Sequence, residues 1–496
     1  MLTKVCKYIK YCKILQMGSL LKKSNDFKLG AAIRRIRRQQ KLTQFQLSNS
    51  LGISTSYLNL IENNRRNVTG KILVSLAKEF NVELSELAAE NDSSLLNDLM
   101  EVFSDVIFDT NYIKNHDVQD LVSSNPEIAR AIIRLYDLYK TDELRENSQE
   151  KDLSKNKTRS LPNISAETIS DLLQKNSNYF PSLEDKANEI LNKIKSIGSG
   201  NIFSDLKNYL SSSHKIRVAT LPPEAKHSTV RFYDPIAKTL VLSDRLPQAS
   251  ITFLIAQQIG LISADNEINS ILKDNEINDI EAIKLGRAAL ASYLAAAILM
   301  PYESFLEQAK IAKYDIEVLE HRFQTSFEQV CHRLTTLHKP GNRGIPFHLM
   351  RVDIAGNISK RFSSSGITIP RYSGACPRLN IYSAFTTPGK VKVQISEMPD
   401  GEKYFCLARA FSKRGGSFST PESYYSIGLG CGLSEAKDMI YSENILLDAI
   451  KNAVPVGISC RTCPRTDCSQ RAFPPNDRAL IFDENIRGIS SYVTPI

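Results

Sequence analysis

Three cysteines near the C-terminal end of the chain have the residue type and spacing of metal ligands. They follow one another as Cys-x2-Cys-x4-Cys, at Cys460, Cys463 and Cys468. Thiolates bind iron–sulfur clusters and zinc, and nearby cations lower thiol pKa values and offset the charge of a thiolate cluster. The cations here are three arginines: Arg461, Arg465 and Arg471. We predict a [4Fe–4S] cluster with one iron open to another ligand, and zinc held by four thiolates as the alternative.

A fourth thiolate ligand would have to come from elsewhere in the chain. Cys376 and Cys431 are the candidates, because Cys331 and Cys406 lie in apolar stretches and are predicted to be core residues. A further alternative is that all these thiols are structural, since three cysteines are a weaker signal than two paired Cys-x2-Cys motifs.

A second group of residues, near the N-terminal end, has the pattern of a DNA-binding motif. Leu47 and Leu51 lie one helical turn apart, Leu58 and Ile61 do so in the next segment, and Gly52 stands between the two. Glycine permits the sharp turn that two short helices need. A helix-turn-helix presents its second helix to the DNA major groove in this way. The pattern therefore predicts that the chain binds duplex DNA.

Polar side chains at the start of the second helix can reach base edges, and arginines after it can reach phosphates. Thr55, Ser56 and Asn59 are the candidates for bases, with an N-cap as the alternative for Thr55 and simple solvent exposure for Asn59. Gln44 is expected to touch a phosphate or to brace a neighbour, and Glu62 to be structural. The predicted DNA-binding residues are Gln44, Ser54, Thr55, Ser56, Tyr57, Asn59, Arg65 and Arg66.

Positive charge is concentrated at the same end of the chain. Residues 1–90 contain 16 Lys and Arg and 6 Asp and Glu, a net charge of +10, whereas the whole chain has +9. The other 406 residues therefore sum to −1. A cationic module on a nearly neutral body is expected of a protein that binds phosphates. A solvated basic face is the alternative.

The apolar segment 251–262 has the frame of a zinc-peptidase helix, in which two histidines hold the metal and a glutamate activates water. It resembles the ImmA/IrrE-type metallopeptidases. By position, the first histidine falls on Gln257, the glutamate on Gln258 and the second histidine on Leu261. The stretch 286–301, where a carboxylate ligand is expected, contains no Asp or Glu. Because an amide is a poor zinc ligand and no general base, we predict a peptidase fold without enzymatic activity.

The composition is that of an ordinary soluble protein, with 42% hydrophobic and 24% charged residues. No apolar run approaches the ~20 residues of a membrane span, since the longest, at 288–300, is interrupted by Ser292 and Tyr293. Residues 1–26 form a basic tail with lysines spaced among apolar residues, and Met17 is an alternative start to Met1. We expect a cytoplasmic protein with reduced thiols and no membrane partner.

Changes in composition divide the remainder into four segments. We predict a DNA-binding domain of five short helices at 27–90, a helical connector and flexible linker at 91–165, a degenerate ImmA/IrrE-like domain at 166–325 and a C-terminal effector and cysteine domain at 326–496. Apolar residues three and four apart predict helix from Ser93 to about Lys140. The expected fold class is a multidomain protein with a mainly α N-terminal half and α+β middle and C-terminal domains.

This combination resembles the short-chain fatty acid (short-chain fatty acyl) transcriptional regulators. The most specific strings are YDIEVLEHRFQTSFEQVCHRLTTLHKPG at 314–341 and PVGISCRTCPRTDCSQRAFPP at 455–475. The similarity extends over about 27–480. The chain departs from it at RLN (378–380), where many relatives have Trp after the Pro-x pair.

The resemblance implies a bacterial transcription factor of the Xre type, not an enzyme, that binds double-stranded DNA as a homodimer or higher homo-oligomer. It implies a short-chain acyl-CoA, such as propionyl-CoA, as an effector bound by the C-terminal half. The regulated genes would serve propionate or acetate metabolism through the methylcitrate or glyoxylate cycle. It also implies an iron–sulfur cluster in some members, on cysteines matching Cys460, Cys463 and Cys468. The alternative function is an ImmA-like protease that switches a repressor in a stress response.

Overall fold

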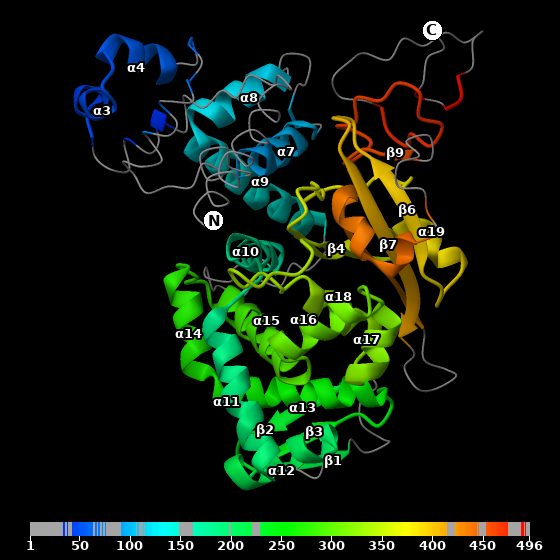
Figure 1. Cartoon of the computed structure of the whole chain (residues 1–496). Helices are drawn as coiled ribbons and strands as arrows, with labels where there is room; N and C mark the ends of the chain where they lie inside the picture. The colour runs from blue at the N-terminus through cyan, green and yellow to red at the C-terminus, as the bar shows by residue number, and fades with distance from the viewer. Residues whose placement is uncertain are drawn as a thin grey trace, which may run out of the picture. The chain divides into compact units, whose positions relative to one another are not determined.

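The chain forms two compact units in the computed structural model (Figure 1). The first unit combines Met1–Leu99 with Asn115–Ile132, and the second combines Met100–Lys114 with Ile133–Ile496. The structure describes residues 33–34, 37, 42–62, 65–66, 68–69, 72, 75, 91–105, 107–108, 113, 115–147, 162–197, 200–220, 229–413, 422–443, 445, 453–474, 488–490 and 492.

In the first unit, α3 (Gln44–Leu51) and α4 (Thr55–Glu62) form the helix pair that the leucine spacing predicts. The Thr43 hydroxyl accepts a hydrogen bond from the Gln46 N–H, and the Gln46 side chain accepts one from the Thr43 N–H, so α3 begins with a capping box. Gly52 ends α3 with a φ of 65°, a left-handed conformation that favours glycine. The core of the pair comprises Ile33, Leu47, Leu58, Ile61 and Ile72. Of the other helices expected between 63 and 90, the structure describes Ile72 and Ser75, which are helical, and the rest lies outside the described residues.

The described residues of the connector form three helices, α7 (Asn91–Phe103), α8 (Asn115–Ser124) and α9 (Pro126–Asn147), so the expected helical stretch is interrupted. The second interruption falls at Pro126, because proline lacks the N–H that a helix interior needs and suits a first turn. Both ends of the segment expected to be a flexible linker are helical, since α9 reaches Asn147 and α10 (Pro162–Lys175) begins at Pro162. Residues 148–161 lie outside the described residues.

The middle region is α+β, as predicted. After α10, its helices are α11 (Pro181–Ile197), α12 (Ile202–His214), α13 (Gln248–Ser263), α14 (Asp265–Asp274) and α15 (Ile280–Leu299). The strands among its described residues are β1 (Arg217–Thr220), β2 (Arg231–Asp234) and β3 (Thr239–Leu242). Strand β3 lies in the centre of the sheet, parallel to β1 and antiparallel to β2.

By length and composition alone, helix α15 is apolar enough to cross a membrane. However, 61% of its most apolar stretch is buried inside the protein. It packs against α10, α11, α13 and α14. Leu290, Leu294 and Ile298 have no more than 1% of their surface exposed. Helix α15 is therefore the central helix of the middle region's core.

The C-terminal region packs helices against a six-stranded sheet (Figure 1). Its helices are α16 (Tyr302–Ile311), α17 (Ile316–Phe323), α18 (Phe327–Leu334) and α19 (Asn380–Ser383), with 3-10 turns at Ala384–Thr386, Leu433–Asp438 and Ile440–Ser442. Its strands are β4 (His348–Asp353), β5 (Ile358–Ser363), β6 (Lys392–Glu397), β7 (Lys403–Lys413), β8 (Ser423–Gly432) and β9 (Val454–Pro455). The strand order is β5-β4-β8-β7-β6-β9, and only β6 and β9 pair in parallel.

Alternate residues of this sheet enter two different cores. Leu349 and Phe405 point into the core shared with α16, α17 and α18, which we call the inner face. Met350 and Cys406, their neighbours in β4 and β7, belong to the cores on the opposite side, which we call the outer face. Helix α19 packs against β6, β7 and β8 there.

A buried ion pair joins the middle and C-terminal regions. The guanidinium of Arg333 on α18 is fully buried and donates to the Glu184 carboxylate of α11 at 2.6 and 2.9 Å. It also donates to the Met300 carbonyl at 2.9 Å and to the Thr336 hydroxyl at 3.0 Å. The Tyr293 hydroxyl donates to Glu184 at 2.6 Å. These bonds satisfy both charges inside the protein.

Candidate functional site

A buried carboxylate fixes the second helix of the helix-turn-helix. Glu62 has 2% of its surface exposed and accepts hydrogen bonds from Arg37 at 2.7 and 3.0 Å and from the Gln44 amide at 2.8 Å. The Arg34 guanidinium donates to the Glu62 carbonyl at 3.2 Å. Burial is the largest influence on the pKa of Glu62 and raises it, but the bonds from Arg37 and Gln44 lower the pKa overall. Gln44 thus braces a neighbouring helix, one of the two roles expected for it.

Two hydroxyl groups near the turn also have partners inside the protein. The Ser54 hydroxyl accepts from the Tyr57 N–H at 3.1 Å and so caps α4. The Thr55 and Ser48 hydroxyls lie 3.0 Å apart, which links α4 to α3. These contacts hold the start of α4 in a defined orientation.

The polar residues on the surface at α4 are Ser56 and Asn59 within the helix and Arg65 and Arg66 just after it. The backbone N–H groups of both arginines donate to the Leu60 carbonyl, at 2.8 and 3.2 Å, which turns the chain at the end of the helix. Exposed cations at a helix end suit phosphates, and exposed amide and hydroxyl groups suit base edges. Contact with DNA remains a prediction for each of them.

The peptidase-like helix α13 carries a hydrogen-bonded amide at the first histidine position. Gln257 accepts from the Arg231 guanidinium of β2 at 3.0 Å and donates to the Ser292 hydroxyl of α15 at 2.7 Å. Gln258 has 4% of its surface exposed, and Leu261 packs against the core. A guanidinium therefore lies beside position 257, where a metalloenzyme would need a ligand, and burial lowers the pKa of Arg231. Sequence reasoning missed Arg231, which lies outside the motif.

The segment that holds the three spaced cysteines is organised by arginine bonds to backbone carbonyls. Arg471 has 6% of its surface exposed and donates to the carbonyls of Cys460 and Cys463, each at 2.7 Å. Arg465 donates to the carbonyls of Val456 and Glu397, at 2.9 and 2.8 Å. Arg461 lies over the Phe473 ring, 4.6 Å from its centroid. Arg465 and Arg471 thus act as structural donors, and the effect of the three arginines on thiolate charge stays a prediction.

The two candidate fourth ligands lie on opposite faces of the sheet. The Cys376 N–H donates to the Ile458 carbonyl at 3.1 Å, beside the cysteine segment. A Cβ atom at Gly457 would lie 2.7 Å from the Cys463 sulfur, so the chain passes close to that thiol. The Gly457 amide also bonds to the Cys376 sulfur. Burial raises the pKa of the Cys376 thiol. Cys431 is on the inner face, with its sulfur 3.7 Å from that of Met439. Within the part of the chain that the structure describes, no three His, Cys, Asp or Glu side chains form a metal-binding group.

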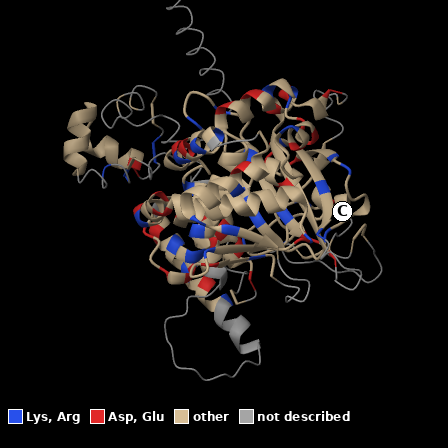
Figure 2. Cartoon of the chain, turned by 90° about the horizontal axis from the view of Figure 1, so that it is seen from below, with Lys and Arg blue, Asp and Glu red and all other residues tan. Residues whose placement is uncertain are grey.

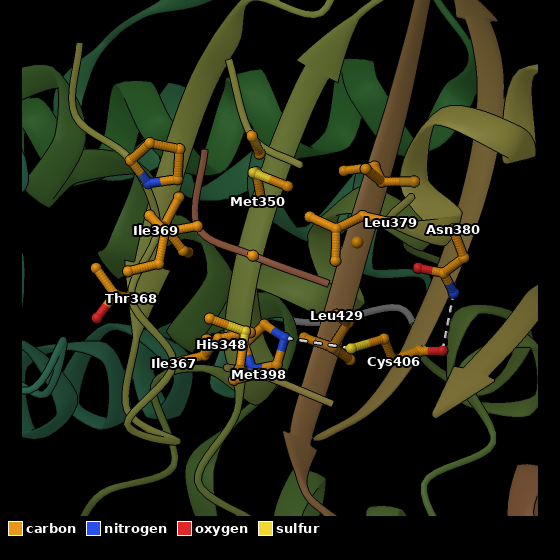
Figure 3. Close-up of a pocket in the computed structure, with 16 residues that line it drawn as sticks. His348, Met350, Ile367, Thr368, Ile369, Leu379, Asn380, Met398, Cys406 and Leu429 are labelled. Carbon is orange, nitrogen blue, oxygen red and sulfur yellow. Dashed lines mark hydrogen bonds between the residues drawn. The ribbon is translucent and has the colours of Figure 1, made fainter. Parts of the chain in front are cut away.

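An apolar cavity of about 40 Å³ lies on the outer face of the C-terminal sheet (Figure 3). It lies over β4, β7 and β8 and is bounded by the segment 367–370, by α19 and by residues 457 and 458. His348 and Met350 of β4 line it, and so does Cys406 of β7. The polar groups of His348 have partners: Nδ1 lies 2.7 Å from the Ser365 hydroxyl and Nε2 lies 3.8 Å from the Cys406 sulfur.

Burial keeps the ionisable groups of this cavity uncharged at neutral pH. It lowers the pKa of His348 to about 3 and raises that of Cys406 to about 11. The Asn380 amide donates to the carbonyls of Lys392 and Cys406, at 3.1 and 2.9 Å. A site with neutral, internally bonded polar groups favours an apolar ligand. Sequence reasoning assigned no function to His348, Met350 or Asn380, because they come together only through the sheet register.

The cavity wall continues into a contact with the connector helices. Directly after 367–370, the N–H groups of Arg371 and Tyr372 donate to the Glu101 carboxylate of α7, at 2.7 and 2.8 Å. The Arg371 guanidinium pairs with carboxylates of α9 and α10, Asp137 at 3.8 Å and Asp171 at 3.3 Å. Burial, the largest influence, raises the pKa of Asp137. These contacts join residues that are far apart in the chain, so no local sequence pattern predicts them.

Three family models match the chain in order. Residues 33–87 match a helix-turn-helix family, residues 211–335 match the IrrE N-terminal-like domain, and residues 336–492 match the C-terminal domain of short-chain fatty acyl coenzyme A regulators. These matches support the resemblance proposed from the sequence.

Similar proteins match over nearly the whole chain. The HTH-type transcriptional regulator RamB of Mycobacterium tuberculosis is 34% identical over 94% of this chain and 98% of its own. PrpR of the same organism is 33% identical over 92% and 93%, and the propionyl-CoA carboxylase regulator of Cereibacter sphaeroides is 33% identical over 93% and 98%. A solved Mycobacterium tuberculosis transcriptional regulator is 34% identical, with a TM-score of 0.63 over 66% of this chain and 99% of that one.

Proposed function

The chain belongs to the family of helix-turn-helix transcriptional regulators with a short-chain fatty acyl coenzyme A regulator domain. We propose that a short-chain acyl-CoA gates its binding to DNA. The regulated genes serve propionate or acetate metabolism, through the methylcitrate or glyoxylate cycle. An effector of this kind acts by binding one arrangement of the protein better than another.

The observation that carries the DNA-binding part is the fixed geometry of α4. Its inner side is held by the Glu62 network and by the Thr55–Ser48 contact, while Arg65 and Arg66 remain exposed. Figure 2 shows Lys and Arg interspersed with Asp and Glu over the chain, and residues 91–496 have a net charge of −1. We infer that the protein works in the cytoplasm as a homodimer or higher homo-oligomer, because two half-sites of DNA require two such helices.

The experiment is a salt titration of binding to a labelled duplex taken from upstream of the protein's own gene. The Arg65→Ala and Arg66→Ala variants should each reduce the slope of log affinity against log salt by about one, because a phosphate contact releases a counterion. Lys437→Ala, an exposed cation of the C-terminal region, is the control and should leave the slope unchanged. An unaltered slope in both arginine variants would contradict their assignment to phosphate.

The acyl-CoA part is tested by adding propionyl-CoA, with free CoA as the control. We expect propionyl-CoA to change the affinity for the duplex by about 5- to 150-fold, the usual range of allosteric coupling. No change with any acyl-CoA of two to six carbons would refute the gating while leaving DNA binding intact.

We also propose a [4Fe–4S] cluster on Cys460, Cys463 and Cys468, with zinc as the runner-up. The spacing of the thiols supports it, and the position of Cys376 beside Gly457 favours Cys376 over Cys431 as a fourth ligand. The described thiols do not converge as a three-donor group, so no step of the gating is derived through a cluster. Anaerobically purified protein should contain iron and absorb broadly in the visible range. Equal iron content in Cys463→Ser would remove that residue as a ligand.

The alternative, an ImmA-like protease switch, is disfavoured by the residues at the catalytic positions. Gln257 is bonded to Arg231 and Ser292, and neither it nor Gln258 can act as a general base. We therefore propose that the middle region is not enzymatic. Stoichiometric zinc, together with chelator-sensitive cleavage of a repressor, would reinstate the protease.

A further inference from the structure

We propose that helix α9 of the connector pairs in parallel with the same helix of a second copy of the chain. This inference rests on the proposed homo-oligomer and names a surface that forms it. It begins from the large apolar residues that α9 exposes, which are Leu135 with 67% of its surface, Ile128 with 52%, Leu138 with 44% and Tyr139 with 40%. Apolar side chains that are exposed together, unlike single scattered ones, mark an interaction site.

The spacing of these residues is that of a coiled coil. Ile128, Leu135 and Leu138 lie at positions i, i+7 and i+10, and the exposed Ala131 lies at i+3. In heptad notation the a positions are Ile128 and Leu135, and the d positions are Ala131 and Leu138. These four residues, which we call the α9 seam, therefore lie along one side of the helix. A second helix with the same seam is the natural partner, because a and d side chains insert between those of a facing helix.

The opposite side of α9 is already occupied within the chain. Ala129, Ile133 and Tyr136 are buried. The Tyr136 ring meets the Tyr372 ring edge to face, with centroids 5.1 Å apart, and the Tyr136 hydroxyl donates to the Asp105 carboxylate at 2.6 Å. A surface helix needs one apolar side to pack against its own protein. Helix α9 has a second apolar side, which the described residues leave exposed.

The charge beside the seam favours a parallel pair. Arg134 is exposed and occupies a g position, and Tyr139 occupies the e position five residues later. In a parallel pair these positions face each other across the seam, so each Arg134 lies beside an aromatic ring of the other copy, which attracts cations. In the antiparallel register that pairs Ile128 with Leu138, the two Arg134 side chains would face each other, and like charges oppose association.

A parallel pair also suits the place of α9 in the chain. The helix begins at Pro126, after the helix-turn-helix, so a parallel pair brings together the N-terminal ends of both α9 helices. Two such helices are related by a two-fold axis along the seam, and both copies use the same surface. An operator with two half-sites requires two recognition helices with this symmetry.

The first test is the self-association of the full chain without acyl-CoA, measured by analytical ultracentrifugation. Leu135→Glu places a charge in the seam and should weaken the association of the wild type about 30-fold or more, the usual effect of a loss at the centre of an interface. Arg130→Gln is the matched control, because it changes the net charge by the same amount at an exposed position of α9 outside the seam. This variant should associate like the wild type.

Cross-linking tests the direction of the pair, and it keeps the test valid should Leu135→Glu fail to fold. In a parallel pair the two copies of position 135 face each other, so Leu135→Cys should form a disulfide between copies under mild oxidation. Arg130→Cys is the control and should form no such link. Mass spectrometry of the linked peptide identifies the 135–135 bond and separates it from links through the native cysteines.

The outcomes separate the interface from the proposed function. A folded Leu135→Glu variant that associates like the wild type, or a folded Leu135→Cys variant without the 135–135 bond, would overturn the parallel α9 pair while effector-gated DNA binding stands. A wild type that stays monomeric, both free and on a duplex with two half-sites, would overturn the proposed homo-oligomer, and the interface with it.

Discussion

The peptidase-like site of the middle region and the cavity of the C-terminal sheet differ in how their polar side chains are bonded and in whether space remains beside them. At the first, Gln257 bonds to Arg231 and Ser292 across three elements, so protein side chains occupy the position of a ligand. At the second, the polar groups of His348 are satisfied within the wall, and about 40 Å³ remains unfilled. At Gln257 the amide thus bonds to protein side chains, whereas in the cavity internal partners satisfy the polar groups and space remains. Only the second retains the physical requirements of a binding site.

The largest expected effect concerns the contact that joins these two regions. Arg333→Met leaves the Glu184 carboxylate buried without its cation, and such losses cost about 3–5 kcal/mol of unfolding free energy. Replacing both residues, as Glu184→Leu with Arg333→Met, removes both charges and should recover most of the loss. Urea unfolding of the wild type, of Arg333→Met and of the double variant measures the difference.

The control for this cycle is the exposed pair of Lys193 and Glu189 on α11. Lys193→Met should change stability far less, because water solvates the remaining carboxylate. Equal destabilisation by Arg333→Met and by the double variant would show that packing, and not an unpaired charge, carries the effect.

The second prediction concerns the pH dependence of the free energy of unfolding, to which His348 of the cavity contributes and Gln257 of the peptidase-like site does not. Gln257 and Gln258 do not titrate, whereas burial lowers the pKa of His348 to about 3 from an ordinary 6.5. Below pH 6.5 the unfolded chain takes up a proton that the folded chain does not, so stability falls as the pH decreases towards 3. At pH 5 His348 alone accounts for a loss of about 2 kcal/mol relative to pH 7. His338, whose pKa burial lowers to about 4, adds a further loss of the same sign.

His348→Gln should reduce the wild-type loss by about 2 kcal/mol, although the variant is less stable at pH 7 because the ring fills its place against Gly430. The measurement is the difference in unfolding free energy between pH 7 and pH 5. Replacing the exposed His321 by Gln is the control and should leave the wild-type difference in place. A His348→Gln variant with the full wild-type pH dependence would contradict the assignment.

The two regions also differ in how far their sites follow from the sequence. The positions of Gln257, Gln258 and Leu261 could be read from one helix, because a metal-binding motif has a fixed local spacing. The cavity could not, since His348, Asn380 and Cys406 meet only through pairing of distant strands and the return of α19 over them. A one-residue change of register would place Leu349 in the cavity and Met350 in the inner core.

The elements themselves were predicted unevenly, for physical reasons. Helices α13 and α15 are long and apolar enough to be recognised, and the turn between β6 and β7 has a clear Pro-Asp-Gly signal. Helix α14 is short and largely polar, so its periodicity is weak. The internal role of Gln44 depends on Glu62, eighteen positions away, which local spacing cannot reveal.

The third prediction concerns transmission from the cavity. The N–H groups of Arg371 and Tyr372 bond to different oxygens of the Glu101 carboxylate. In Glu101→Gln one of these oxygens becomes an NH2 group, so only one of the two N–H groups keeps its acceptor, and that acceptor is uncharged. Hydrogen bonds to a charged group contribute about 1.5–3 kcal/mol, so the contact should loosen by roughly that amount. Propionyl-CoA should still bind, but its effect on DNA affinity should fall towards none.

The measurement is DNA affinity with and without propionyl-CoA, combined with calorimetry of the effector alone. Asp171→Asn, which alters an exposed partner of Arg371, is the control and should retain most of the response. A full response in Glu101→Gln would show that the coupling passes through other contacts.

The smallest effect returns to the closed pocket. Gln257→Ala removes the acceptor of Arg231 and the donor to Ser292 at a partly exposed position, so about 1 kcal/mol of stability should be lost. Gln257→Glu retains the acceptor and adds a charge that complements Arg231, so it should be neutral or slightly stabilising. Zinc should not raise the melting temperature of either variant or of the wild type, because a guanidinium, and no carboxylate of α15, faces the position. Zinc stabilisation of Gln257→Glu would mean that Arg231 can be displaced, and that this pocket is closed by a single contact that a metal can replace.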